Sequence, residues 1–279
     1  MADVKDLRAA YDLLQLCQKN PRIKEKTIRS KVSPYSSYSA TKGFLKRIRK
    51  EEILFGPKLW INSGFVVDLV KKSRKSSLEL FEKYQQEPQV TYVMGLMGTF
   101  SLLAFKRGAS ILKYAICTIP SYPGRKSITE IELTEKGPIE RDEYPRGWDE
   151  LDWKVFNSMR DPTRSFGKVG GELGVSWTTA QAHYKKILKD CKIWVTFFPE
   201  GYSSYQQAIL TFETDYEENL KKELEKIDRT SFLYKYNNTN ILFLLYHDYR
   251  DLRKFELLKK EKKIRNLTFS TPIAWKDQF

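Results

Sequence analysis

Apolar positions along the chain recur first with a helical period in three short stretches and then with a strand-like period. In the first half, Leu7, Tyr11 and Leu14 line one predicted helix, and two more are predicted at 27–32 and 37–50. The second half repeats this order, with predicted helices at 151–159, 166–173 and 177–190. Each half is therefore predicted to open with a trihelical unit.

The rest of each half predicts the order strand, helix, two strands, helix, strand. In the first half the predicted strands are 59–69, 90–97, 100–106 and 128–134, and the helices are 76–86 and 110–119. In the second half the predicted strands are 205–212, 231–236, 241–246 and 265–270, and the helices are 216–227 and 249–260. This βαββαβ order is the ferredoxin-like arrangement. We therefore predict an α+β protein with two repeats of a winged-helix-like helix-turn-helix unit followed by a ferredoxin-like βαββαβ unit.

An internal repeat supports this division. Identical residues stand 140 positions apart in four pairs: Ser36 and Ser176, Ala40 and Ala180, Lys46 and Lys186, Ile53 and Ile193. The predicted helix-turn-helix domains are 1–55 and 148–198, the ferredoxin-like (RAM-like) domains are 56–140 and 199–279, and 141–147 is the linker.

The charge of the chain indicates an acidic partner. Its 279 residues include 49 Lys and Arg against 35 Asp and Glu, which gives a net charge of +14. Such a balance favours nucleic acid first and an anionic membrane surface second. The sequence has no apolar run of about 18 residues, so neither a membrane span nor a signal peptide is expected. We expect a cytoplasmic, nucleoid-associated protein without a membrane partner.

Few residues of the chain are suited to catalysis or metal binding. Cys17, Cys117 and Cys191 are far apart and outside any CxxC spacing, so neither a disulfide framework nor a zinc site is predicted. His183 and His247 are the only histidines. We therefore predict no catalytic residues, no metal and no cofactor, and a protein that is not an enzyme.

Three segments of the second half carry a family resemblance. They are 151–156 (LDWKVF), 161–165 (DPTRS) and 172–176 (ELGVS). Together with the two-module order, they resemble the Lrp/AsnC, or feast/famine, family of transcription regulators. The first half departs from the pattern, because Pro34 stands where Gly174 stands, and proline cannot adopt the positive φ that glycine can.

The resemblance implies that the third helix of each trihelical unit enters the major groove of DNA by its N-terminal end. The residues expected to contact DNA are Ser37, Tyr38, Ser39, Thr41, Lys42, Lys46, Arg47, Arg49, Thr178, Thr179, Gln181, Ala182, His183, Lys185 and Lys186. Gly98 and Thr99 are the expected effector-binding residues, at a turn between two strands. The tryptophans, apart from Trp177, are expected to be core or interface anchors.

The function implied is that of a sequence-specific transcription regulator. Its expected partners are double-stranded DNA and an amino-acid-like effector, and its two halves are expected to pair as an intramolecular pseudo-dimer that could assemble further. Two alternatives stay open. One is an enzyme like the siroheme decarboxylases, which resemble the same architecture, and the other is an architectural chromatin or promoter adaptor without an effector.

Overall fold

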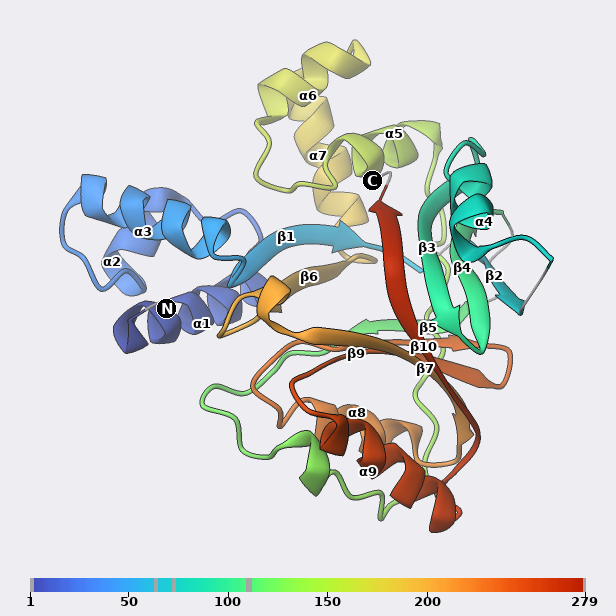
Figure 1. Ribbon diagram of the computed structural model, residues 1–279. Coiled ribbons are helices and arrows are strands. Elements are labelled where there is room, and N and C mark those ends of the chain that lie inside the picture. The colour runs from blue at the N-terminus through green and yellow to red at the C-terminus, as the bar shows by residue number, and fades with distance from the viewer. Residues whose placement is uncertain (1–2, 63–64, 72–73, 109–111, 278–279) are drawn as a thin grey trace. The chain divides into compact units, whose positions relative to one another are not determined.

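The computed structural model describes residues 3–62, 65–71, 74–108 and 112–277 (Figure 1). The chain divides into two units, and each unit takes segments from both halves of the sequence. The helical unit consists of residues 1–61 and 144–204, and the sheet unit consists of residues 62–143 and 205–279. Within the described residues, no helix combines the length and apolar character needed to cross a membrane.

The helical unit contains both predicted trihelical sets. The first is α1 (Val4–Lys19), α2 (Glu25–Lys31) and α3 (Tyr38–Lys50), and the second is α5 (Glu150–Ser158), α6 (Phe166–Leu173) and α7 (Trp177–Ile187). Each set is followed by one strand, β1 (Leu54–Trp60) or β6 (Lys192–Phe197), and the two strands pair antiparallel. Arg22 of the first set donates to the carbonyl oxygens of Pro162 and Arg164 of the second.

The third helices fix the register of the internal repeat. Ser37 caps α3 by accepting a hydrogen bond from the Ala40 amide, and Ser176 caps α7 by accepting one from the Thr179 amide. The equivalent serines are thus Ser37 and Ser176, so the predicted pairing of Ser36 with Ser176 was displaced by one residue. Both helices form because a capped first turn is followed by an apolar stripe at helical spacing, with Phe44 and Ile48 buried in α3.

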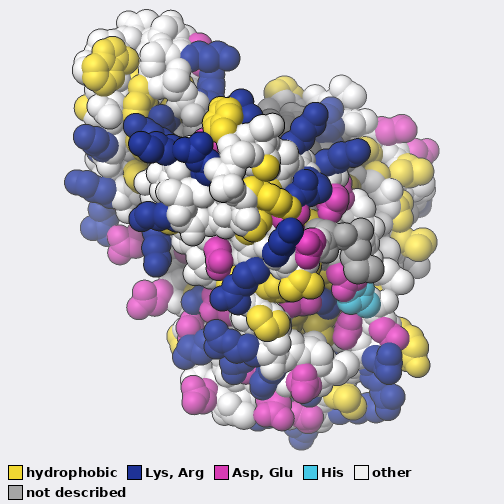
Figure 2. All heavy atoms as spheres, turned by 90° about the vertical axis from the view of Figure 1, so that its left-hand side faces the viewer, with side chains coloured by type: hydrophobic (Ala, Val, Ile, Leu, Met, Phe, Trp, Pro, Cys, Tyr) yellow, Lys and Arg dark blue, Asp and Glu magenta, His cyan; other side chains and the backbone are white. Residues whose placement is uncertain are grey.

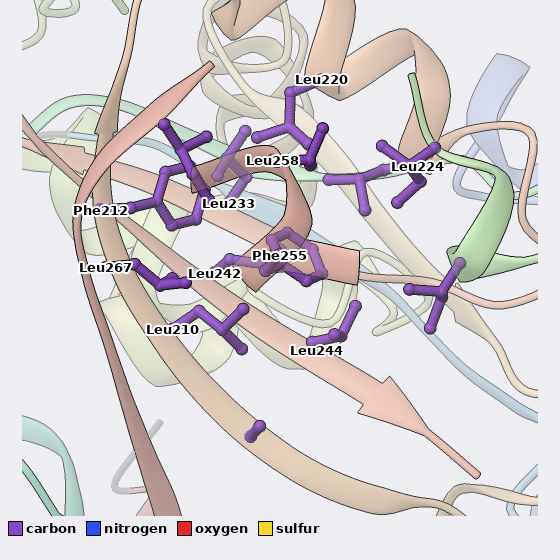
Figure 3. Close-up of a cluster of buried hydrophobic side chains, with 14 of the residues drawn as sticks. Leu210, Phe212, Leu220, Leu224, Leu233, Leu242, Leu244, Phe255, Leu258 and Leu267 are labelled. Atoms are coloured by element: carbon purple, nitrogen blue, oxygen red, sulfur yellow. The ribbon is translucent and has the colours of Figure 1, made fainter. Parts of the chain in front are cut away.

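The second half of the sheet unit is a complete ferredoxin-like βαββαβ module. Its elements are β7 (Gln206–Thr214), α8 (Glu217–Leu224), β8 (Phe232–Tyr236), β9 (Thr239–Tyr246), α9 (Tyr249–Lys260) and β10 (Ile264–Asp277), with the antiparallel strand order β10-β7-β9-β8. In Figure 3, Leu210 and Phe212 of β7 lie in one apolar cluster with Leu220 of α8 and Phe255 of α9. This packing of an apolar sheet face on two helices confirms the predicted α+β fold class.

The first half follows this pattern only as far as its third strand. β2 (Phe65–Lys71), α4 (Ser77–Tyr84), β3 (Val90–Gly98) and β4 (Phe100–Arg107) form the order β2-β4-β3. The predicted strand 59–69 was wrong as one element, because it spans the end of β1 and the start of β2. The predicted helix 110–119 was also wrong: residues 110–111 lie outside the described residues, and β5 (Leu112–Cys117) pairs with β8.

The predicted strand 128–134 was wrong as well, and its apolar residues have another use. The segment begins with the 3-10 helix η1 (Ile128–Glu130), and Ile128, Ile131 and Leu133 are buried in the core beside α8 and α9. The chain around it is fastened to α8, since Lys126 pairs with Glu223 at 2.8 Å and Asn219 accepts from the Thr134 amide at 2.7 Å. The first half therefore has no fourth strand of its own in this segment.

β10 joins the two halves into one sheet. Its residues Ile264–Ser270 pair with β7, and its residues Ser270–Asp277 pair with β3 of the first half. The eight-stranded order is β2-β4-β3-β10-β7-β9-β8-β5. The sheet is strongly curved. This curvature is evident from the rings of Tyr92 on β3 and Phe243 on β9, which lie 6.4 Å apart although β10 and β7 separate these strands in the sheet.

Gly98 has a structural role at this junction. It ends β3 with φ of +133°, and a Cβ atom there would lie 2.6 Å from the Phe269 carbonyl oxygen of β10. That oxygen accepts from the Thr99 amide at 3.2 Å. The two residues predicted to bind an effector thus hold the β3–β4 turn against β10.

Replacing Gly98 with alanine should destabilise the protein by about 1–3 kcal/mol, because the residue is left in a backbone region that side chains avoid and its Cβ meets a carbonyl oxygen. The matched control is Gly167→Ala in α6, where a Cβ would meet nothing within 4 Å and the change should be neutral or stabilising. Urea denaturation measures both. Equal midpoints for the two variants would contradict the assigned role of Gly98.

Candidate functional site

The first turns of α3 and α7 do not present all of the predicted DNA contacts to solvent. Tyr38 and Trp177, the first residues of the two helices, are exposed by 49% and 58%. Thr41, however, is fully buried, and its hydroxyl donates to the Ser37 carbonyl oxygen at 3.0 Å, so its prediction as a surface contact was wrong. The hydroxyls of Thr178 and Thr179 both hydrogen-bond the capping Ser176.

The remaining predicted contacts differ in exposure. The exposed ones are Ser37, Ser39, Lys42, Lys46, Arg49, Ala182, Lys185 and Lys186, and the partly buried ones are Arg47, Gln181 and His183. Figure 2 turns the side of Figure 1 that carries α2 and α3 toward the viewer and shows Lys and Arg side chains gathered there. Exposure alone does not make these cations available, because several have partners inside the unit.

A buried carboxylate binds the basic residue near the end of α3. Asp6, in the first turn of α1, is 2% exposed and accepts hydrogen bonds from Arg47 Nη2 at 2.6 Å and Nε at 3.0 Å. The Tyr35 hydroxyl donates to its other oxygen at 2.9 Å. The hydrogen bond to Asp6 is the largest of the effects that raise the pKa of Arg47. The guanidinium is thus held by α1.

The second half repeats this contact with different residues. Asp152, in the first turn of α5, is fully buried and contacts Lys186 Nζ, His183 Nδ1 at 2.7 Å and the Asp149 amide at 2.9 Å. Burial opposes ionisation of this carboxyl, but the hydrogen bonds from Lys186, Asp149 and His183 outweigh burial and lower its pKa. The hydrogen bond between Lys186 and Asp152 also raises the pKa of Lys186.

These two carboxylate contacts are equivalent in the repeat. Asp6 and Asp152 are each the third residue of their helix, and Arg47 and Lys186 are each the tenth of theirs. Arg47, His183 and Lys186 were predicted as DNA contacts, but the structure places their polar atoms against buried carboxylates. Their main role is to fasten the third helix of each set to the first.

The same place bears on metal binding. Ligand atoms of Asp149, Asp152 and His183 lie within 4.8 Å of one another, a spacing that a metal ion could bridge. The Lys186 ammonium contacts both aspartates and already supplies a positive charge to this cluster. The arrangement is that of an ion-pair network.

A pocket in the sheet unit was not predicted from the sequence. Beyond Ser270, β10 leaves β7 and follows β3, while β7 residues 206–208 continue to pair with β9. The divergence opens a pocket of about 300 Å³, which we call the fork pocket. It is lined by Gln207, Thr271, Pro272, Ile273, Ala274 and Trp275. Trp275 is 54% exposed, so it is not a core residue.

A cluster of Tyr205, Arg229 and His247 lies at the same end of β7. The guanidinium of Arg229 is 4.9 Å from the ring centre of Tyr205, and the His247 ring lies 4.5 Å from the Tyr205 ring. Arg229 is 7% exposed and donates to the Leu245 carbonyl oxygen at 2.9 Å. Because Gln206 pairs with Tyr246, the strand register brings Tyr205 and His247 together. Nothing local in the sequence indicates this long-range pairing.

Comparison with solved structures finds the same fold in an enzyme. The crystal structure of siroheme decarboxylase NirDL matches with a TM-score of 0.55 and 10% identity, over 95% of this chain and 91% of that chain. Its co-complex with an iron-uroporphyrin III analogue matches with a TM-score of 0.54 and 11% identity, over 95% and 92%. No family model and no curated protein sequence matches the chain.

These matches correct the functional prediction. They agree with the Lrp/AsnC-like architecture, but the matched protein is a decarboxylase, which contradicts the predicted DNA-binding regulator and the prediction that the chain is not an enzyme. The physical reason is that the module pair defines a scaffold, and different chemistry can be placed on one scaffold.

The buried Asp152 contact gives a test of the helical unit. Asp152→Asn should lower the free energy of unfolding by about 2–4 kcal/mol, because Lys186 loses a buried counter-charge. Glu150→Gln, on the same helix, should have little effect on the free energy of unfolding, because the ion pair of Glu150 with Lys154 is exposed to solvent.

The pH dependence of stability should also differ between the wild type and Asp152→Asn. Because folding lowers the pKa of Asp152, its stabilising contribution is present above the ordinary value of 3.8 and is lost as the pH falls through the lower folded pKa. Asp152→Asn should therefore lose less stability than the wild type over that acid range, as measured by urea denaturation. Parallel pH curves for wild type and Asp152→Asn would contradict this account.

Proposed function

We propose that the chain is an enzyme that binds a carboxylate-bearing tetrapyrrole and removes carboxylate groups from it. The observation that carries the proposal is the extent of the match to siroheme decarboxylase NirDL, which covers 95% of this chain and 91% of that chain. A match of this extent includes both halves of the repeat, and a shared helix-turn-helix module alone would not give it.

The charge of the chain supports such a substrate. A net charge of +14 favours anionic ligands, and the substrate of a decarboxylase carries at least one carboxylate. Two of the cations of the third helices are held by Asp6 and Asp152, whereas Lys42, Lys46 and Arg49 of α3 are exposed and add to the surplus of positive surface charge. This surplus of positive charge is enough to attract a ligand with several carboxylates. Sequence-specific DNA binding would also need side chains held in fixed positions against the bases.

Decarboxylation also needs a proton donor. The bond between the carboxylate carbon and its neighbouring carbon breaks, carbon dioxide leaves, and the electron pair that stays on the neighbouring carbon takes up a proton. The imidazole of His183 is hydrogen-bonded to the buried Asp152, whereas His247 is exposed. The His247 ring packs against the Tyr205 ring at an interplanar angle of 36°, and Arg229 is also close to the Tyr205 ring. We assign His247 as the proton donor of the proposed reaction.

The proposal predicts that siroheme incubated with the protein loses carbon dioxide, which mass spectrometry of the extracted tetrapyrrole detects. His247→Gln should slow this loss about 100-fold or more, because a positioned proton donor is removed. Tyr249→Phe, at an exposed position two residues away, is the matched control and should keep the wild-type rate. Tetrapyrrole of unchanged mass after incubation with excess wild-type protein would refute the proposal.

A further inference from the structure

The fork pocket exists because β10 pairs with two different strands along its length. β10 pairs with β7 up to Ser270 and with β3 from Ser270 onward, and its register with β3 shifts between Pro272 and Ala274. Proline has no amide hydrogen to donate to a ladder and is tolerated at such irregular positions. Where β10 lines the pocket, its main chain therefore no longer pairs with β7.

Two large apolar residues that line the pocket are also exposed to solvent. Trp275 and Ile273 are exposed by 54% and 44%, although large apolar side chains are usually buried. A half-exposed indole beside a pocket provides a flat surface on which a planar ring can stack. Gln207 and Thr271 also line the pocket, and their side chains carry an amide and a hydroxyl. This combination fits a flat ring that carries polar substituents.

The size of the fork pocket narrows the choice of ligand. The volume of about 300 Å³ lies at the lower end of the range for small-molecule pockets. It accommodates one pyrrole ring with a carboxylate side chain, and the rest of a macrocycle would remain outside.

We infer that the fork pocket is the subsite that holds one carboxylate-bearing pyrrole of the tetrapyrrole, stacked on Trp275. The inference rests on the proposed function and adds the place of binding to it. The exposed position of Trp275 also makes the subsite testable, because its replacement leaves the buried core unchanged.

The test is a titration with iron-uroporphyrin III, followed by the change in its visible absorption. Trp275→Ala should weaken binding about tenfold through loss of stacking, and Trp275→Phe should restore most of the affinity. Leu78→Ala is the matched control, since Leu78 is 52% exposed in α4 and lies outside the fork pocket.

The outcomes separate this inference from the proposed function. If the wild type binds iron-uroporphyrin III and Trp275→Ala binds it equally well, the subsite is overturned and the proposed function stands. If the wild type does not bind it, the proposed function fails and the subsite falls with it. Light scattering adds a third outcome: a change in molar mass on Trp275→Ala with unchanged binding would make the pocket a contact between copies of the chain and overturn the subsite.

Discussion

The main-chain ladder of β10 is the contact on which the sheet unit depends. The strand pairs with β7 along its first residues and with β3 along its last, so the two halves of the sequence share one sheet. The first half needs this arrangement because its segment 128–134 packs its apolar residues beside α8 and α9 and supplies no strand. Without β10, one edge of β3 would present unpaired amides and carbonyls. β5 covers the other outer strand of the second half by pairing with β8.

The same contact creates the feature that we connect with function. Because β10 pairs first with β7 and then with β3, it separates from β7 partway along its length. This separation of β10 from β7 opens the fork pocket. Gly98 permits the close approach of the β3–β4 turn to β10 at the point of change. The helical unit is stabilised differently, by a buried carboxylate in the first helix of each set that binds a cation of the third. A basic helix face is therefore weak evidence for DNA binding when its cations are held internally.

Much of the fold follows from local signals in the sequence. The helical periods and the capping serines place both trihelical sets, and alternation along β7, β8 and β9 places the second ferredoxin-like module. The segment that became β5 was assigned to a helix because a short apolar run fits either period. Its strand conformation depends on pairing with β8 and on the hydrogen bond from Tyr114 to Asn240, a residue 126 positions away. Neither contact leaves a local signal.

The candidate site was less predictable than the fold, because it arises from contacts that are distant in sequence. Trp275 resembles any core tryptophan until the divergence of β10 exposes it, and His247 meets Tyr205 only through the register of β7 and β9.

Hydrogen exchange along β10, with and without iron-uroporphyrin III, tests the account most directly. It predicts slow exchange at 264–270 in both states and slower exchange at 271–276 when the ligand is bound. Ligand protection elsewhere in the chain with none at 271–276 would contradict it.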